Sequence, residues 1–71
     1  MDISQRIVSL RKERAISQKR LAEICSLTEV AIQNYESGRR KPSYDALLLI
    51  ADAFNVSIDY LVGRSDDPTR H

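Results

Sequence analysis

Residues Ser17 to Gly38, SQKRLAEICSLTEVAIQNYESG, decide the fold of this chain. Ser17 and Thr28 have side chains that favour helix N-caps, and each precedes a run with one apolar side. Between these runs, Cys25-Ser26-Leu27 predicts a three-residue turn, and Gly38 suits the left-handed end of the second run. The stretch therefore predicts two short helices joined by a tight turn.

An amphipathic helix is predicted before this pair. Ile3, Ile7 and Leu10 recur at the spacing i, i+4, i+7, and charged residues fill the positions between them. This helix is expected to run from about Ile3 to Arg14.

Two further helices are predicted after the pair. Ser43 and Ser57 are their N-caps, and Asn55 and Gly63 suit the left-handed backbone that ends a helix. The last helix is short and extends through Leu61. Beyond Gly63 the chain is polar, so we expect a tail there with nothing to bury.

Composition agrees with one small helical domain. The 71 residues are 42% hydrophobic and 30% charged, and two glycines and two prolines are few for a β sandwich or barrel. One cysteine excludes an internal disulfide, and one Cys with one His cannot supply a four-ligand zinc site. We predict an all-α, compact five-helix domain over residues 1–63 and a flexible tail over residues 64–71, with no metal and no cofactor.

Charge is distributed unevenly along the chain. Residues 1–42 hold nine Lys or Arg and five acidic residues, a net charge of +4, whereas residues 43–71 hold two Arg and five Asp, a net charge of −3. The first part is therefore suited to face phosphates. No apolar run approaches the roughly 18 residues of a membrane span, and no signal-peptide pattern opens the chain, so we expect a cytoplasmic protein without membrane contact.

Five short motifs carry a resemblance to a known family. They are Leu10–Arg14 (LRKER), Ser17-Gln18, Leu21–Glu23 (LAE), Tyr35–Pro42 (YESGRRKP) and Leu61–Ser65 (LVGRS). Through them, residues 3–65 resemble the lambda-repressor-like (Cro and XRE) proteins. The resemblance implies a helix-turn-helix made by the second and third helices, with the third in the major groove of double-stranded DNA. It also implies a transcriptional repressor that binds a pseudo-palindromic operator as a homodimer and associates with the nucleoid when bound.

The outer side of the third helix carries candidate base contacts. Winding it at about 100° per residue places Ala31, Ile32 and Tyr35 on one packing side and leaves a polar, barely charged arc outside. Amides can pair with adenine, a carboxylate can accept from cytosine N4, and an apolar side chain can contact a thymine methyl. The predicted base-reading residues are Glu29, Val30, Gln33 and Asn34.

Phosphate contacts are predicted on both sides of that helix. Gln18 and Lys19 lie in the first turn of the second helix, where free N–H groups and the helix dipole can receive a phosphate. Gln18 also matches the family's phosphate-binding Gln. In related proteins the loop that corresponds to residues 39–41 lies along the DNA backbone. The predicted phosphate-binding residues are Gln18, Lys19, Thr28, Ser37, Arg39, Arg40 and Lys41.

Arg11 and Glu36 are predicted to form a structural ion pair. Arg11 lies at the edge of the apolar stripe of the first helix, and Glu36 borders the packing side of the third. The matching residues form such a bridge in the family. The chain departs from the family at Ala15 and Ser26, where glycine is common, so left-handed backbone is expected at residues that disfavour it.

Two other classes of function compete with DNA binding. An enzyme is excluded because the sequence offers no nucleophile–base pair, no metal set and no glycine-rich phosphate loop. A protein-binding module, such as an antitoxin or adaptor, remains the alternative, because the same scaffold can present a helix to a protein. Apolar residues on the last helix and over Val56–Val62 are the candidate homodimer surface, and a partner protein could control activity.

Overall fold

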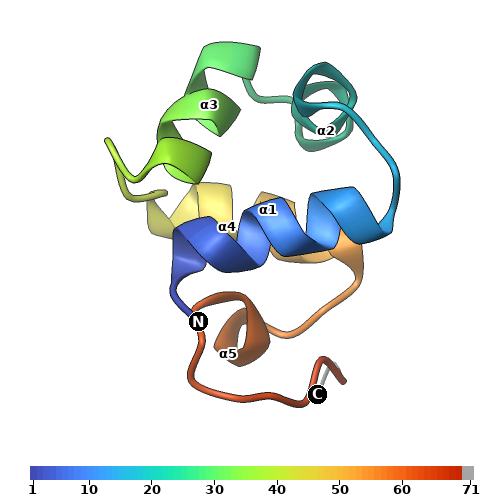
Figure 1. Cartoon of the computed structure of the whole chain (residues 1–71), viewed down its shortest axis with the longest axis vertical. Helices are drawn as coiled ribbons and strands as arrows, with labels where there is room; N and C mark the ends of the chain where they lie inside the picture. The colour runs from blue at the N-terminus through green and yellow to red at the C-terminus, as the bar shows by residue number, and fades with distance from the viewer. Residues whose placement is uncertain (70–71) are drawn as a thin grey trace.

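Five helices make up the computed structural model, which describes residues 1–69 (Figure 1). They are α1 (Ile3–Glu13), α2 (Gln18–Cys25), α3 (Glu29–Ser37), α4 (Tyr44–Phe54) and α5 (Ile58–Leu61), and the described residues contain no strand. The predicted all-α, five-helix fold is confirmed. Cys25 was expected in the turn after the second helix, but it is the last residue of α2.

Side-chain caps set the start of every helix. The N-cap side chain of each accepts a hydrogen bond from the backbone N–H three residues later, and these caps are Asp2, Ser17, Thr28, Ser43 and Ser57. At α1 the bond is reciprocal, because the Gln5 side chain also accepts from the Asp2 N–H at 3.1 Å. This capping box was missed in the sequence, although its two residues have the expected spacing.

Left-handed backbone closes three of the helices. Ser26, Gly38 and Asn55 follow α2, α3 and α4 with φ values of 57°, 80° and 56°, and Ala15 lies in the turn after α1 with φ 55°. The left-handed conformation expected at Ala15 and Ser26 is therefore confirmed. It costs a residue with a Cβ roughly 1–2 kcal/mol, so packing of the helices on either side must hold both turns.

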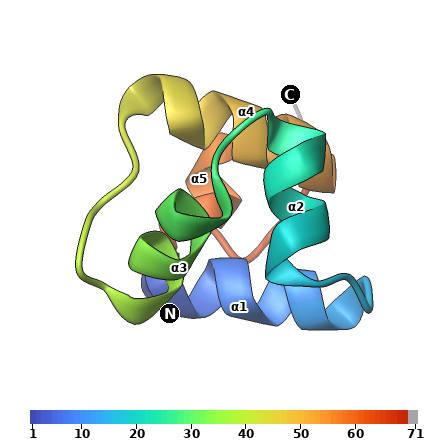
Figure 2. The same cartoon turned by 90° about the horizontal axis from the view of Figure 1, so that it is seen from above.

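The core lies between all five helices. In Figures 1 and 2, α1 crosses one side of the molecule, and α2 and α3 lie at the end opposite α5. α1 packs against α3 and α5, and α4 packs against α2 and α5. The buried hydrophobic residues that form the core cluster are Ile7, Leu10, Leu21, Ala22, Cys25, Ile32, Ile50, Ala51, Phe54, Val56 and Leu61. Burial raises the pKa of the Cys25 thiol to about 11, which keeps it protonated as a small apolar group.

The segment after α5 returns along that helix. The Asp59 carbonyl accepts hydrogen bonds from the N–H groups of Arg64 and Ser65, at 2.8 and 3.2 Å. The Ser57 N–H donates to the Pro68 carbonyl at 3.1 Å. Flexibility of the tail stays a prediction, and its last two residues, including His71, lie outside the described residues.

Arg6 joins α1 to this returning segment. Its side chain is buried, and its guanidinium lies 3.8 Å from the centroid of the Tyr60 ring, a cation–π contact. The guanidinium also lies 3.8 Å from the exposed Asp66 carboxylate. The sequence did not predict this cluster, since no local spacing relates its members.

Within residues 1–69, no helix has both the length and the apolar character needed to cross a membrane.

Gly63 and Gly38 provide a matched test of the packing between the two ends of the chain. Both have left-handed backbone, so alanine at either position should cost about 1–2 kcal/mol of unfolding free energy. A Cβ at Gly63 would also clash with the backbone oxygen of Met1, whereas at Gly38 the nearest atom would be Ser4 Oγ at 3.7 Å. We expect Gly63→Ala to destabilise more than Gly38→Ala in chemical denaturation. Equal losses would contradict a close contact at Met1.

Candidate nucleic-acid interface

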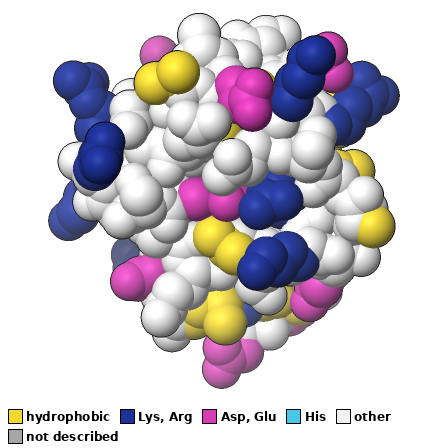
Figure 3. Space-filling view, turned by 45° about the horizontal axis from the view of Figure 1, so that its top comes forward, with side chains coloured by type: hydrophobic (Ala, Val, Ile, Leu, Met, Phe, Trp, Pro, Cys, Tyr) yellow, Lys and Arg dark blue, Asp and Glu magenta, His cyan; other side chains and the backbone are white. Residues whose placement is uncertain are grey.

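Helices α2 and α3 form the end of the molecule that carries the predicted contacts. They pack against each other, and the turn between them is closed by the Leu27 N–H, which donates to the Ala22 carbonyl at 2.9 Å. Figure 3 turns this end of the molecule toward the viewer. Lys and Arg side chains stand at both edges of that face, and a few Lys, Arg, Asp and Glu side chains lie between them on a surface that is otherwise mostly uncharged.

The outer side of α3 carries the predicted base-reading residues. Glu29, Val30 and Gln33 are exposed, with Val30 61% accessible, and Asn34 is half-buried. Ile32 is completely buried on the opposite side. The helix is therefore oriented as its winding predicts, and contact of these four side chains with bases stays a prediction.

The basic loop is held against the end of α3. The Asn34 carbonyl accepts a hydrogen bond from the Arg40 N–H at 3.3 Å and another from Ser37 Oγ at 3.2 Å. Ser37 Oγ also accepts from the Arg39 N–H at 3.4 Å. The side chains of Arg39, Arg40 and Lys41 are exposed. Because its backbone is tied to α3, the loop carries its cations at a fixed place beside that helix.

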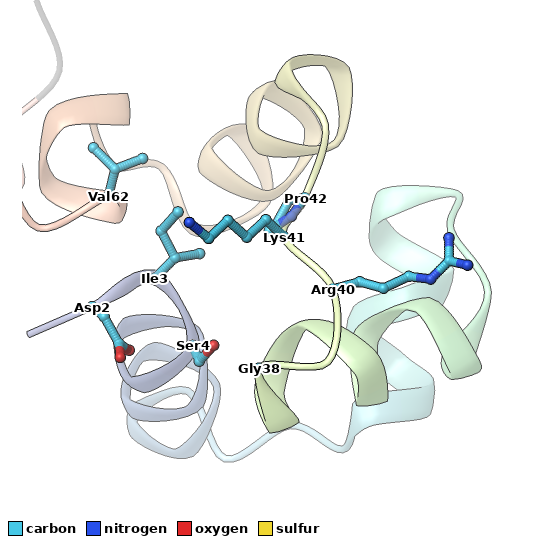
Figure 4. A pocket seen from close by; sticks show the side chains of 8 residues that line it. All are labelled: Asp2, Ile3, Ser4, Gly38, Arg40, Lys41, Pro42 and Val62. Carbon is cyan, nitrogen blue, oxygen red and sulfur yellow. The ribbon is translucent and has the colours of Figure 1, made fainter.

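Two cations of this loop point in different directions. In Figure 4, the Arg40 side chain extends toward α3 and α2, whereas the Lys41 side chain extends away from Pro42 toward Ile3 and Val62. The space around Lys41 is a hollow of about 340 Å³ between α1, the loop and the end of α5. Arg40 is therefore already on the side of α3, and Lys41 would reach a phosphate there only after a change of rotamer.

Polar and charged residues also gather at the start of α2. The Ser17 hydroxyl caps the helix by accepting from the Arg20 N–H at 2.9 Å, and the first N–H groups of a helix have no partner within it. Lys19 is exposed. Arg20 pairs with Glu23 at 3.7 Å, but both side chains are more than half accessible, so water screens the pair and it stabilises little.

One buried carboxylate joins the first three helices. The Glu36 side chain is 7% accessible and accepts from Arg11 Nε at 2.7 Å and from Arg11 Nη2 at 3.0 Å. Arg11 Nη1 donates to the Ile16 carbonyl at 3.0 Å, in the turn before α2. The hydrogen bond with Glu36 raises the pKa of Arg11 above its ordinary value, although burial opposes this shift, so the guanidinium stays charged.

A third donor completes this carboxylate site. Gln18 Nε2 donates to Glu36 Oε1 at 3.0 Å, across the contact between α2 and α3. The sequence predicts the pairing of Arg11 with Glu36, but for Gln18 it predicts only a contact with phosphate. No local spacing relates residues 18 and 36, so the bond could not be predicted without the angle between the two helices.

Comparison with known proteins agrees with this geometry. A family model described as helix-turn-helix matches residues 7–61. The HTH-type transcriptional regulator YobD of Bacillus subtilis is 36% identical over 64 residues, which are 90% of this chain and 57% of YobD. The cryptic phage CTXphi transcriptional repressor RstR of Vibrio cholerae shows the same identity over the same shares of the two chains. The chain thus spans little more than half the length of these relatives.

A solved structure shares the fold over nearly its whole length. The P22 c2 repressor, solved in complex with a synthetic operator, superposes with a TM-score of 0.85 at 29% sequence identity. The match covers 92% of this chain and 98% of that one. The compact lambda-repressor-like arrangement expected from the sequence is therefore confirmed.

The ion pair of Arg11 and Glu36 can be tested by its effect on stability. Arg11→Ala would leave the Glu36 carboxylate buried without its charged partner, so we expect the free energy of unfolding to fall by about 3 kcal/mol. Lys12→Ala is the matched control, because Lys12 is the exposed neighbour on the same helix. Thermal or urea unfolding measures both. Melts of the two variants that coincide would exclude a contribution from the pair.

Proposed function

This chain belongs to the helix-turn-helix family, and from that premise we propose that it is a sequence-specific regulator of transcription that binds double-stranded DNA as a repressor. The observation that carries the proposal is the outer side of α3, which exposes Glu29, Val30 and Gln33 and is preceded along the chain by the exposed Lys19 of α2 and followed by the exposed Arg39 and Arg40. The alternative of an antitoxin or adaptor is not favoured, because YobD and RstR are described as a transcriptional regulator and a repressor.

In this proposal α3 lies in the major groove and reads base edges. The Gln33 and Asn34 amides would pair with adenine, the Glu29 carboxylate would accept from cytosine N4, and Val30 would contact a thymine methyl. The nearly neutral character of this surface suits such contacts, because base edges present hydrogen-bonding groups and methyls while the phosphates carry the charge.

Phosphate contacts would position α3 in the groove. Gln18 and Lys19 would bind one phosphate at the start of α2, and Arg39 and Arg40 would bind the strand beyond the end of α3, joined by Lys41 after a change of rotamer.

Two hydroxyls in the proposed set are already engaged. Thr28 Oγ1 accepts the capping bond from the Ala31 N–H at 3.0 Å and keeps its own proton to donate. Ser37 Oγ donates to the Asn34 carbonyl and would have to exchange that bond for a phosphate. Thr28 therefore suits a phosphate contact better than Ser37.

Binding as a homodimer to a pseudo-palindromic operator is part of the proposal, since paired reading helices match two half-sites about one helical turn apart. The apolar surface expected over residues 56–62 is smaller than the sequence suggested, because Val56 and Leu61 are only 2% and 0% accessible. A dimer contact through α5 would depend on the partly accessible side chains there, which are Ile58, Tyr60 and Val62.

Action on DNA would place the protein at the nucleoid, and control by a partner protein stays a prediction.

Selection from random duplexes by the purified chain tests the proposal most directly. We expect the recovered sequences to share a motif with two-fold symmetry and half-sites about 10 base pairs apart. Recovery of unrelated sequences would show that α3 does not discriminate bases.

The salt dependence of binding reports on the proposed phosphate contacts. On the recovered duplex, log affinity should fall linearly with log salt concentration, with a slope of about −0.9 per neutralised phosphate. Affinity that does not change with salt would contradict contacts through Lys19, Arg39 and Arg40.

Single substitutions separate base reading from phosphate binding. Gln33→Ala or Asn34→Ala should relax preference at one base pair of each half-site, by about 1–3 kcal/mol of discrimination. Arg40→Ala should weaken binding to all sequences alike and should reduce the salt slope by about 1. The measurement is a binding titration on the recovered duplex and its single-base variants. A uniform loss for Gln33→Ala would assign that residue to the backbone instead.

A further inference from the structure

We infer that Glu36 is a positioning residue for DNA binding, which acts by holding the side-chain amide of Gln18 in its binding orientation before DNA arrives. The inference rests on the proposed function and extends it to a residue that itself does not touch the ligand. The Glu36 side chain is too buried for a contact with DNA, and its carboxylate would repel phosphate.

The chemistry of the Gln18–Glu36 bond fixes which way the amide faces. A glutamine amide has two N–H donors on nitrogen and one acceptor oxygen, and an ionised carboxylate only accepts. The nitrogen of Gln18 must therefore face Glu36, with one N–H bound at 3.0 Å. The second N–H stays available at the first residue of α2, where the backbone N–H groups also lack partners within the helix.

Arg11 makes this arrangement compatible with an anionic ligand. Its two bonds to Glu36 neutralise the carboxylate, so Gln18 is held by a group that adds no net negative charge to the surface. The same guanidinium binds the Ile16 carbonyl, two residues before Gln18. The start of α2 is thus fixed from its backbone by Arg11 and from its side chain by Glu36.

Gln33 shows what the bond adds. It is also a glutamine of the proposed interface, but its side chain is exposed and makes no hydrogen bond within residues 1–69. Ordering a free glutamine on binding costs conformational entropy, and a side chain that is ordered beforehand avoids that cost. Gln18 should therefore bind phosphate with a smaller entropic loss than an unrestrained glutamine.

A double-mutant cycle on DNA affinity tests the inference. Glu36→Asp keeps a carboxylate charge near Arg11 but is one methylene shorter, which draws the oxygen that accepts from both Gln18 and Arg11 back from these donors, and Gln18→Ala removes the amide. We expect affinity to fall about fivefold for Glu36→Asp and about tenfold for Gln18→Ala. The double variant should bind within about twofold of Gln18→Ala alone, because Glu36 acts through Gln18.

Arg40→Ala is the control for this cycle, since its side chain makes no hydrogen bond or ion pair with either residue in the described structure. The fold loss of DNA affinity caused by Arg40→Ala and the fold loss caused by Glu36→Asp should therefore multiply in the variant that carries both substitutions. All affinities are measured where circular dichroism shows each variant fully folded. If the losses from Gln18→Ala and Glu36→Asp also multiply, Glu36 has only a structural role and the inference is wrong.

Side-chain NMR of the free wild-type protein tests the same point without a variant. The Gln18 NH₂ group should have an order parameter near the roughly 0.85 of rigid backbone, whereas the Gln33 NH₂ group should lie below about 0.6. A Gln18 amide as mobile as that of Gln33 would overturn the inference.

The failure of the proposed function and the failure of the positioning role can be told apart. If the wild-type protein binds no duplex at all, both fail. If it binds a duplex and the affinity losses of Glu36→Asp and Gln18→Ala multiply, only the positioning role is refuted.

Discussion

The Glu36 carboxylate is the constraint on which the arrangement of the first three helices depends. A charge that is so little exposed must be paired and hydrogen-bonded, and its partners come from α1 and from the first residue of α2. Arg11 of α1 and Gln18 of α2 can both donate to this carboxylate of α3 only when the three helices are placed as they are here. Burial of Ile32 and the other apolar core residues stabilises the domain, and the bonds of the carboxylate tie α1 and the start of α2 to α3.

Features that depend on local rules could be predicted from the sequence. Four of the five N-caps, the left-handed Gly38 and Asn55 and the buried side of α3 follow from spacing and residue type. The left-handed backbone of Ala15 and Ser26 was expected only through the resemblance to the family, because their residue types disfavour it. The remaining cap, Asp2 with Gln5, was available to the same reasoning. The candidate base-reading residues were likewise found because the period of a helix decides which side chains face outward.

Features that depend on how distant segments meet could not be predicted. The bond of Gln18 to Glu36, the contact of Arg6 with Tyr60 and the direction of Lys41 each require the relative placement of two or three elements. The burial of Val56 and Leu61 belongs to the same class, because their apolar character alone left open whether they face the core or solvent. Sequence patterns report which side of a helix is apolar, and tertiary packing decides what covers that side.

The presence of an N-cap on every helix has a consequence for kinetics. Each helix can begin to form from interactions between residues three apart, so little chain entropy is lost before the first favourable contacts appear. Helical domains with mainly local contacts fold in microseconds to milliseconds. A newly synthesised copy should therefore be folded almost as soon as it leaves the ribosome. The amount of folded protein should then rise with synthesis without a delay caused by folding.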